Sequence, residues 1–182
     1  MKSCVKKQLP YFLIVFLLPI TAMLWWWGLF SSTSVQVIER GNYRYVYLDA
    51  QGPYSKLPSK QKEVLFELGK QNINAGVQIT VVLSDPRSTP YEKLNARTGL
   101  ISDASSEPKA PLLVDVIPVR KVALAEIKAH PLLAYGKTYS ALLAFSQANH
   151  MNLQLPTVEL FDKSILSVEM PLNTNNLTKV AP

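Results

Sequence analysis

The chain has few of the side chains that build covalent cross-links and metal centres. Cys4 is its only cysteine, and His130 and His150 are its only histidines. A single cysteine excludes a disulfide within the chain, and too few thiol and imidazole groups remain for a zinc cluster. No second ligand stands at metal-binding spacing beside either histidine. The fold must therefore rest on its hydrophobic core, and we expect no metal or other cofactor.

The chain also lacks a concentrated basic patch. Its formal net charge is +6, but Lys2, Lys6 and Lys7 stand before a long apolar segment with no acidic residue among them. Without these three lysines, the excess of basic residues (19) over acidic ones (13) falls by half, from 6 to 3. No later stretch gathers Lys and Arg in the way that binding to a phosphate backbone requires. We therefore expect no nucleic-acid partner.

What the chain does have is one long apolar run near its start. Residues 11–30 (YFLIVFLLPITAMLWWWGLF) are almost continuously apolar, and about 20 such residues form a helix that crosses a bilayer. The alternative is a cleaved signal peptide, whose apolar core is typically about 7–15 residues and ends in small residues. This run ends instead in Trp25-Trp26-Trp27. We predict a transmembrane helix over 11–30.

The residues on either side of this run predict an orientation. Lysines precede it and balanced charges follow it, which favours a cytoplasmic N-terminus, and tryptophan rings settle at the membrane interface. We expect a single-pass protein of the inner (cytoplasmic) membrane whose domain faces the periplasm or the cell exterior. The predicted parts are a cytoplasmic tail over 1–10, the helix over 11–30, a tether over 31–34, a domain over 35–172 and a flexible tail over 173–182.

Two stretches of the domain have the same order of elements. In the first, β-rich patterns at 35–38 and 43–48 precede a helix from Pro58-Ser59 to about Asn72 and a strand at 77–83, followed by a loop-rich connection with a short strand near Leu100. The second stretch has strands at 112–117 and 122–127, a helix at 135–149, and strands at 157–161 and 165–170.

A shift of 78 residues overlays these two stretches, with Val46 on Leu124 and Leu65 on Leu143. We interpret this as an internal pseudo-repeat. The predicted fold class is α+β, with two pseudo-repeated strand-helix-strand-strand halves that form one antiparallel sheet with the helices on one face.

Several short motifs within 35–172 point to a known family. They are Gly52-Pro53-Tyr54 with Leu57 before the first helix, Leu83-Ser84-Asp85-Pro86 after a strand, the stretch 130–145, Val158-Glu159-Leu160-Phe161, and the run 168–172. In this order they resemble the GyrI-like small-molecule-binding family, the fold also used as the effector-binding part of some bacterial transcription activators. Two motifs depart from the family pattern. His130-Pro131-Leu132 stands where a Gly-x-Tyr turn is usual, and Leu83 stands where an aromatic residue is usual.

The resemblance implies a ligand cleft between the two halves with an acidic residue inside it. In several relatives that cleft takes bulky, aromatic or cationic compounds, some relatives hydrolyse reactive small molecules, and a haem-binding branch shares the general architecture. The acidic position of the family falls on Glu159, and the repeat places the neutral Val81 as its counterpart.

Glu159 is therefore the leading candidate for a ligand-binding residue. A carboxylate in an apolar strand has a raised pKa when it is desolvated, and a cationic ligand would restore a charge partner. The alternative is a solvent-facing glutamate on an edge strand. Six aromatic residues have two interpretations: they form walls for a lipophilic ligand, or they pack in the core. They are Tyr45, Tyr47, Tyr54, Tyr135, Tyr139 and Phe161.

Three functions remain open at this point. The first is a membrane-anchored, non-enzymatic module that binds a small molecule outside the cytoplasm. The second is a small-molecule hydrolase in which Glu159 acts as general base. The third is a module that holds a protein partner at the membrane. A fold alone does not choose among them, because function belongs to the site.

Overall fold

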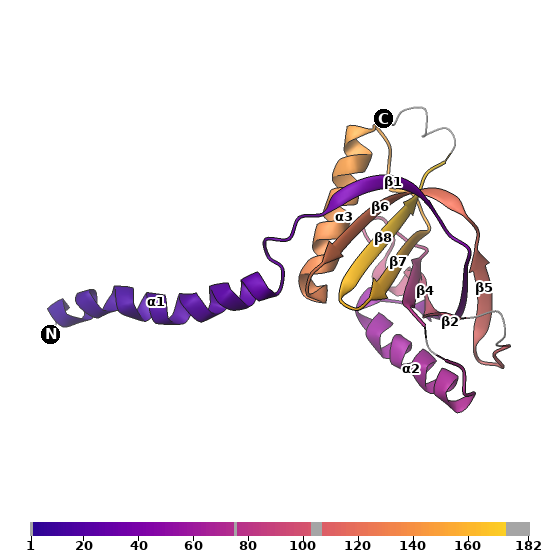
Figure 1. Ribbon diagram of the computed structural model, residues 1–182, viewed down its shortest axis with the longest axis horizontal. Coiled ribbons are helices and arrows are strands. Elements are labelled where there is room, and N and C mark those ends of the chain that lie inside the picture. Colours follow the sequence, from indigo (N-terminus) through magenta and orange to yellow (C-terminus); the bar gives the residue numbers. More distant parts are fainter. Residues whose placement is uncertain (1, 75, 103–106, 174–182) are drawn as a thin grey trace.

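The computed structural model describes residues 2–74, 76–102 and 107–173, and within them the chain is an α+β protein with an eight-stranded antiparallel sheet (Figure 1). The helices are α1 (Lys2–Trp26), α2 (Leu57–Lys70) and α3 (Pro131–Ala148). The strands are β1 (Ser34–Arg40), β2 (Tyr43–Gln51), β3 (Gln78–Val82), β4 (Asn95–Ile101), β5 (Leu113–Ile117), β6 (Arg120–Lys128), β7 (Thr157–Asp162) and β8 (Ile165–Pro171). The predicted α+β class and antiparallel sheet are confirmed.

The boundaries of α3 and β4 differ from those expected. Helix α3 begins at Pro131 rather than at Tyr135, because Pro131 takes the first helical position and the His130 imidazole accepts a hydrogen bond of 3.4 Å from the backbone N–H of Leu132. Strand β4 is a full strand rather than a short one, since β2 and β3 pair with it on both sides. Its Gly99 is required there, because a Cβ would lie 1.9 Å from the carbonyl oxygen of Val46.

The two halves of the domain exchange their first strands. The sheet order is β1-β6-β8-β7-β3-β4-β2-β5, so β3 and β7 meet at the centre and each half supplies four strands. Strand β1 does not pair with β2, its neighbour in sequence, but lies against β6 of the second half. Strand β5, which precedes β6, pairs in the same way with β2 of the first half. Each half is thus completed by a strand of the other.

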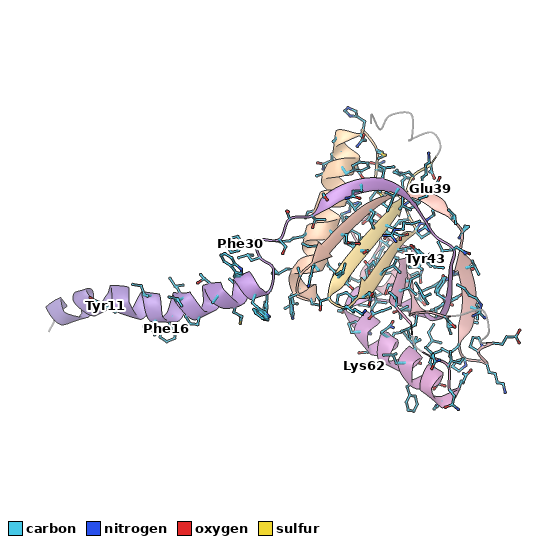
Figure 2. All side chains as sticks on the ribbon, viewed as in Figure 1. Tyr11, Phe16, Phe30, Glu39, Tyr43 and Lys62 are labelled. Atoms are coloured by element: carbon cyan, nitrogen blue, oxygen red, sulfur yellow. The ribbon has the colours of Figure 1, made fainter. Side chains whose placement is uncertain are left out.

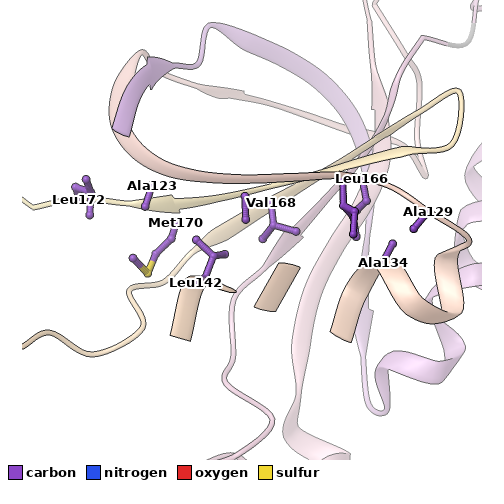
Figure 3. Packing of buried hydrophobic residues seen from close by; sticks show 10 residues of the cluster. Ala123, Ala129, Ala134, Leu142, Leu166, Val168, Met170 and Leu172 are labelled. Atoms are coloured by element: carbon purple, nitrogen blue, oxygen red, sulfur yellow. The ribbon is translucent and has the colours of Figure 1, made fainter. Parts of the chain in front are cut away.

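Helices α2 and α3 pack on the same face of the sheet over its two outer parts. Helix α2 contacts β2 and β4, and its Val64 and Leu68 are buried against Val46 and Leu100. Helix α3 contacts β1, β6 and β8. Figure 3 shows the core beneath it, where Leu142 of α3 lies near Met170 and Val168 of β8. Neither helix covers the central strands β3 and β7 on this face.

The opposite face carries a third buried cluster, and a hydrogen bond on this face shows that the sheet is strongly curved. Tyr43 Oη donates a hydrogen bond of 2.8 Å to Glu169 Oε1, although three strands separate β2 from β8 in the sheet. Glu169 is fully buried and also lies 3.4 Å from a guanidinium nitrogen of Arg120. Tyr45 and Tyr47 pack on this face with Ile79.

Helix α1 extends away from the domain (Figure 1). It begins before residue 11 and ends at Trp26, short of residue 30. No helix in the part of the chain that the structure describes is long and apolar enough to cross a membrane. The transmembrane helix expected over 11–30 thus stays a prediction, and the flexible tail expected over 173–182 lies, except for residue 173, outside the described residues.

Candidate functional site

A cavity of about 620 Å³ lies between α2 and α3 over the central strands. It forms there because each helix covers its own half of the sheet and leaves β3 and β7 exposed between them. On this face Thr80 of β3 stands directly opposite Glu159 of β7, so the two side chains share the floor. The volume falls within the range of about 300–1,000 Å³ that is typical of small-molecule sites.

The walls of the cavity are mainly aromatic and aliphatic, and come from both halves of the domain. The start of α2 and the turn before it supply Tyr54, Leu57, Pro58, Gln61 and Lys62; the loop after β3 supplies Ser84, Asp85, Pro86 and Arg87; α3 supplies Tyr135, Tyr139 and Leu143; the segment before β7 supplies Leu153 and Leu155; and the sheet supplies Gln78, Thr80, Val82, Thr157 and Glu159.

Glu159 is the acidic group at the floor of this cavity. It is 8% exposed, and its Oε1 accepts a hydrogen bond of 2.6 Å from Tyr139 Oη. Burial raises the pKa of Glu159 from 4.5 to about 7, and the hydrogen bond from Tyr139 opposes part of that rise. The carboxyl group is therefore poised to change its charge near neutral pH.

Glu159 has no cationic partner among the described residues, in contrast to Glu169. Glu169 has Arg120 beside it at 3.4 Å, whereas no Lys or Arg in the described ranges pairs with Glu159 and none contributes to its pKa. Arg87, at the edge of the cavity, is held by Asp85 at 2.7 Å. An ionised Glu159 is thus a buried negative charge that is balanced only by a hydrogen bond.

Three tyrosines surround this carboxyl group. Tyr54 donates a hydrogen bond of 2.6 Å to the carbonyl oxygen of Ser84 and thereby ties the turn before α2 to the end of β3. Burial raises the pKa of Tyr135 to about 12, and the charge of Glu159 adds to that rise. Burial and the same carboxylate also raise the pKa of Tyr139. All three phenols therefore stay neutral and can offer ring faces to a ligand.

The structure brings together four of the six predicted site residues. Glu159, Tyr54, Tyr135 and Tyr139 line the cavity. Tyr47 does not, because it lies on the opposite face of the sheet, where the Arg97 guanidinium stands 4.9 Å from its ring centre.

Phe161, the sixth predicted residue, does not line the cavity either. It packs beside the core beneath α3. Tyr45, which the sequence also offered as a wall, lies with Tyr47 on the far face.

The repeat also misplaced the counterpart of Glu159. Val81 pairs with Val158 and faces away from the cavity, because side chains alternate along a strand. A gapless shift of 78 residues matches the helices but puts the strands on the wrong face. Thr80 is the residue that faces Glu159.

Sequence reasoning missed a polar cluster on the α2 side of the cavity. Gln61 of α2 donates to the carbonyl oxygen of Gly99 at 3.1 Å and accepts a short hydrogen bond from Thr98. The Thr98 hydroxyl oxygen in turn lies 3.5 Å from the hydroxyl oxygen of Thr80. The signal was present in the sequence, since Gln61 falls one helical turn before the buried Val64 and threonines recur on β3 and β4.

The arrangement can hold an organic cation against a carboxylate, or move a proton at Glu159. It does not resemble a metal centre, because the described residues contain no group of three or more His, Cys, Asp and Glu side chains that could hold an ion.

Comparison with known proteins identifies the fold. The sequence matches no established family, and no curated protein is detectably similar to it. Three solved structures have the same fold. SAV2435 bound to tetraphenylphosphonium has 13% identity and a TM-score of 0.57, over 79% of this chain and 96% of that one. The C-terminal domain of EcmrR has 13% identity and a TM-score of 0.58, over 76% and 98%.

The third structure is EcmrR in a complex with DNA, determined by cryo-EM. It has 12% identity and a TM-score of 0.59, over 93% of this chain and 69% of that one. At such identities the likeness shows the fold alone, and the ligand and the DNA belong to those proteins.

Proposed function

We propose that this protein is a GyrI-like small-molecule-binding protein whose ligands are lipophilic, aromatic cations. The observation that carries the proposal is Glu159, a buried carboxyl group at the floor of an apolar cavity with no cationic partner in the described part of the chain. A buried charge without a partner destabilises the folded state. A cation in the cavity would pair with the carboxylate and remove this destabilisation, and the free energy gained would contribute to its binding.

The walls favour an aromatic or bulky cation over a small inorganic one. Neutral phenol rings attract a cation that lies over their faces, and Tyr54, Tyr135 and Tyr139 supply three such rings. The hydroxyl groups of Tyr54 and Tyr139 are already hydrogen-bonded, so these two residues offer a ligand mainly their rings. A delocalised charge within an apolar body fits such a lining. The tetraphenylphosphonium complex of SAV2435, which has the same fold, supports this ligand class.

A thermal-shift experiment on the full chain tests the proposal. A ligand that binds only the folded state raises the midpoint of unfolding. We expect tetraphenylphosphonium to raise the midpoint of the parent protein and a neutral aromatic of similar size to raise it less. Glu159→Gln should lose most of the response to the cation. The control is Glu92→Gln, at an exposed acidic residue, which should respond like the parent. Equal stabilisation of parent and Glu159→Gln would contradict the proposal.

A hydrolase that uses Glu159 as general base is the second candidate. It is favoured by the pKa of Glu159, which at about 7 lies where a general base works best. Turnover of a reactive lipophilic ester or epoxide that disappears in Glu159→Gln, while binding of an uncharged product persists, would support this function. Stoichiometric binding of such a compound without turnover would oppose it.

Membrane attachment through α1, with the domain outside the cytoplasm, is a further part of the proposal. It is supported by the apolar sequence of 11–30 and by the exposed side chains of Val15, Leu18 and Trp26. Cys4, the only thiol, allows a direct test. In intact cells, a membrane-impermeant thiol reagent should spare Cys4 and should label a Cys4→Ser, Lys163→Cys variant. The reverse pattern, or recovery of the chain without membranes, would contradict it.

A further inference from the structure

The end of α1 is fastened to the start of α3 by a specific set of contacts. The ring of Trp27 stacks on that of His130, with 4.5 Å between ring centres and 16° between planes. The backbone N–H of His130 donates to the carbonyl oxygen of Trp27 at 2.9 Å. Gly28 has a φ of +83°, and a Cβ there would lie 2.9 Å from the Cβ of Ala129. The chain can therefore approach this closely only with glycine at position 28.

Lys137 completes this contact, which we call the clamp and define as Trp27, Gly28, His130 and Lys137. The Lys137 ammonium donates to three carbonyl oxygens after α1: to Gly28 at 3.1 Å, to Ser31 at 2.7 Å and, by a shorter bond, to Leu29. These three residues follow the last helical residue, Trp26, and hydrogen bonds from a charged donor are stronger than those between neutral groups. The clamp thus joins α1 to the domain, and Figure 2 labels Phe30 in the segment that leads from α1 toward the domain.

Helix α3 carries the clamp and the cavity on its two sides. Tyr135 and Tyr139 are four residues apart and share the side that faces the cavity. Lys137 lies midway between them in sequence, so the period of about 100° per residue places it on the other side of the helix. His130 caps the same helix just before these turns. A shift of the first two turns of α3 therefore moves both a wall of the cavity and the anchor of α1.

We propose that α3 couples occupancy of the cavity to the fastening of α1, so that the clamp is weaker or stronger when a ligand is bound. The inference rests on the proposed function, because it needs a ligand beside Tyr135 and Tyr139. Coupling of this kind is reciprocal: if a ligand changes the clamp, breaking the clamp changes the affinity for the ligand by the same factor. His130 and Lys137 are then positioning residues for the tyrosines of the cavity.

The three tryptophans of the chain make the test direct. All of them lie at positions 25–27, and none lines the cavity. A full-length Trp25→Phe, Trp26→Phe protein, kept in solution with a mild detergent, retains Trp27 as the only indole, stacked on His130. Tetraphenylphosphonium is titrated into it with calorimetry to report binding and with tryptophan emission to report the clamp. Glu159→Gln in the same detergent corrects for partition of the cation into micelles.

The expected result has two parts. Saturation of the cavity changes the emission of Trp27, and Lys137→Met abolishes that change while shifting the affinity by about five-fold or more. The control, Lys163→Met, removes an exposed lysine from the turn between β7 and β8 and should behave like the parent. If Lys137→Met does not fold, His130→Asn serves instead, because asparagine still caps α3 but cannot stack on Trp27.

The possible failures are distinguishable. Heat of binding without a change in Trp27 emission, or with an unchanged affinity in the clamp variant, overturns the coupling and leaves the proposed function standing. No heat of binding in the parent with any lipophilic cation overturns the proposed function, and the coupling falls with it.

Discussion

The phenolic oxygen of Tyr139 lies 2.6 Å from Oε1 of Glu159, and this hydrogen bond joins α3 to the floor of the cavity. It lowers the pKa of Glu159 against the larger effect of burial. The Tyr139 hydroxyl group therefore helps to set the pKa of Glu159, and with it the pH at which the cavity becomes negatively charged.

The free energy of unfolding should fall as the pH rises, because the buried carboxyl group of Glu159 ionises. Burial raises its pKa from 4.5 to about 7, so between these values the folded protein holds a proton that the unfolded chain has released. This stabilising contribution is complete below pH 4.5 and is lost as the pH rises through about 7. Glu159→Gln should therefore exceed the parent in stability above the folded pKa by roughly 2–4 kcal/mol. Urea unfolding on both sides of that pKa measures the difference, and equal pH profiles for the two proteins would contradict it.

The affinity for a monovalent lipophilic cation should rise with pH. Below the pKa of about 7 a proton competes for Glu159, so affinity should grow by up to about ten-fold per pH unit and become constant above it. Calorimetry with tetraphenylphosphonium across this range gives the profile. A neutral aromatic ligand is the control, and its affinity should not follow the same curve. A flat profile for the cation would show that Glu159 is not its partner.

Tyr139→Phe should move that profile to higher pH. Without the hydroxyl, the ionised carboxylate loses the hydrogen bond that lowers its pKa, and we expect a rise of roughly one unit. The affinity for a cation near neutral pH should therefore fall, although no ligand contact of the ring is lost. Tyr135→Phe is the matched control: it removes a hydroxyl of the same cavity that does not bond to Glu159 in the described structure. An unshifted midpoint in Tyr139→Phe would contradict this role.

The second buried glutamate should behave in the opposite way, as a structural group. Arg120→Met removes the ion-pair partner of the fully buried Glu169 and leaves only the weaker effect of Arg40. Breaking a buried ion pair typically lowers the free energy of unfolding by about 3–5 kcal/mol. Adding Glu169→Gln to that variant should restore part of the loss, because the uncompensated charge is gone. Ligand affinity should stay near the parent value in the double variant. Denaturant unfolding measures the first effect and calorimetry the second.

Gly136→Ala should stabilise the protein. Gly136 lies inside α3, and a Cβ there would meet no atom within 4 Å. Alanine in a helix interior is favoured over glycine by about 0.8–1 kcal/mol. Gly69→Ala, near the end of α2 and equally open, is the control and should gain less because helix ends fray. A loss of stability in Gly136→Ala would mean that α3 moves toward a neighbour at this position.

Much of the fold could be predicted from the sequence because the local sequence pattern of most elements favours the same structure as their packing does. Runs such as 77–83 are β-rich, and the face of α2 that carries Val64 and Leu68 is apolar. Strand β4 was underestimated because Asn95, Arg97 and Gly99 weaken the local signal, and its pairing with both β2 and β3 supplies what the sequence pattern lacks.

The site was less accessible to such reasoning. Alternation along β2 predicts that Tyr43, Tyr45 and Tyr47 share a face, but only pairing with β4 and β5 decides which face that is. The same limit explains Val81, since an offset of one residue moves a side chain across the sheet. Glu159 was identified because it stands in an apolar strand at the acidic position of the family that the sequence resembles; isolation alone would equally have selected Glu169. The short bond from Thr98 to Gln61 depends on contacts between elements far apart in the sequence.

The pairing of β1 with β6 and of β5 with β2 bears on the ancestry of the chain. Two identical subunits that swap their leading arms make the same set of contacts, and domain swapping is a low-cost route to a dimer. Fusion of such a swapped homodimer into one polypeptide leaves a pseudo-symmetric protein in which neither copy is complete alone. In such a protein the two copies can carry different side chains at the shared centre, as Thr80 and Glu159 do. A site built at that centre from both copies would take a single ligand.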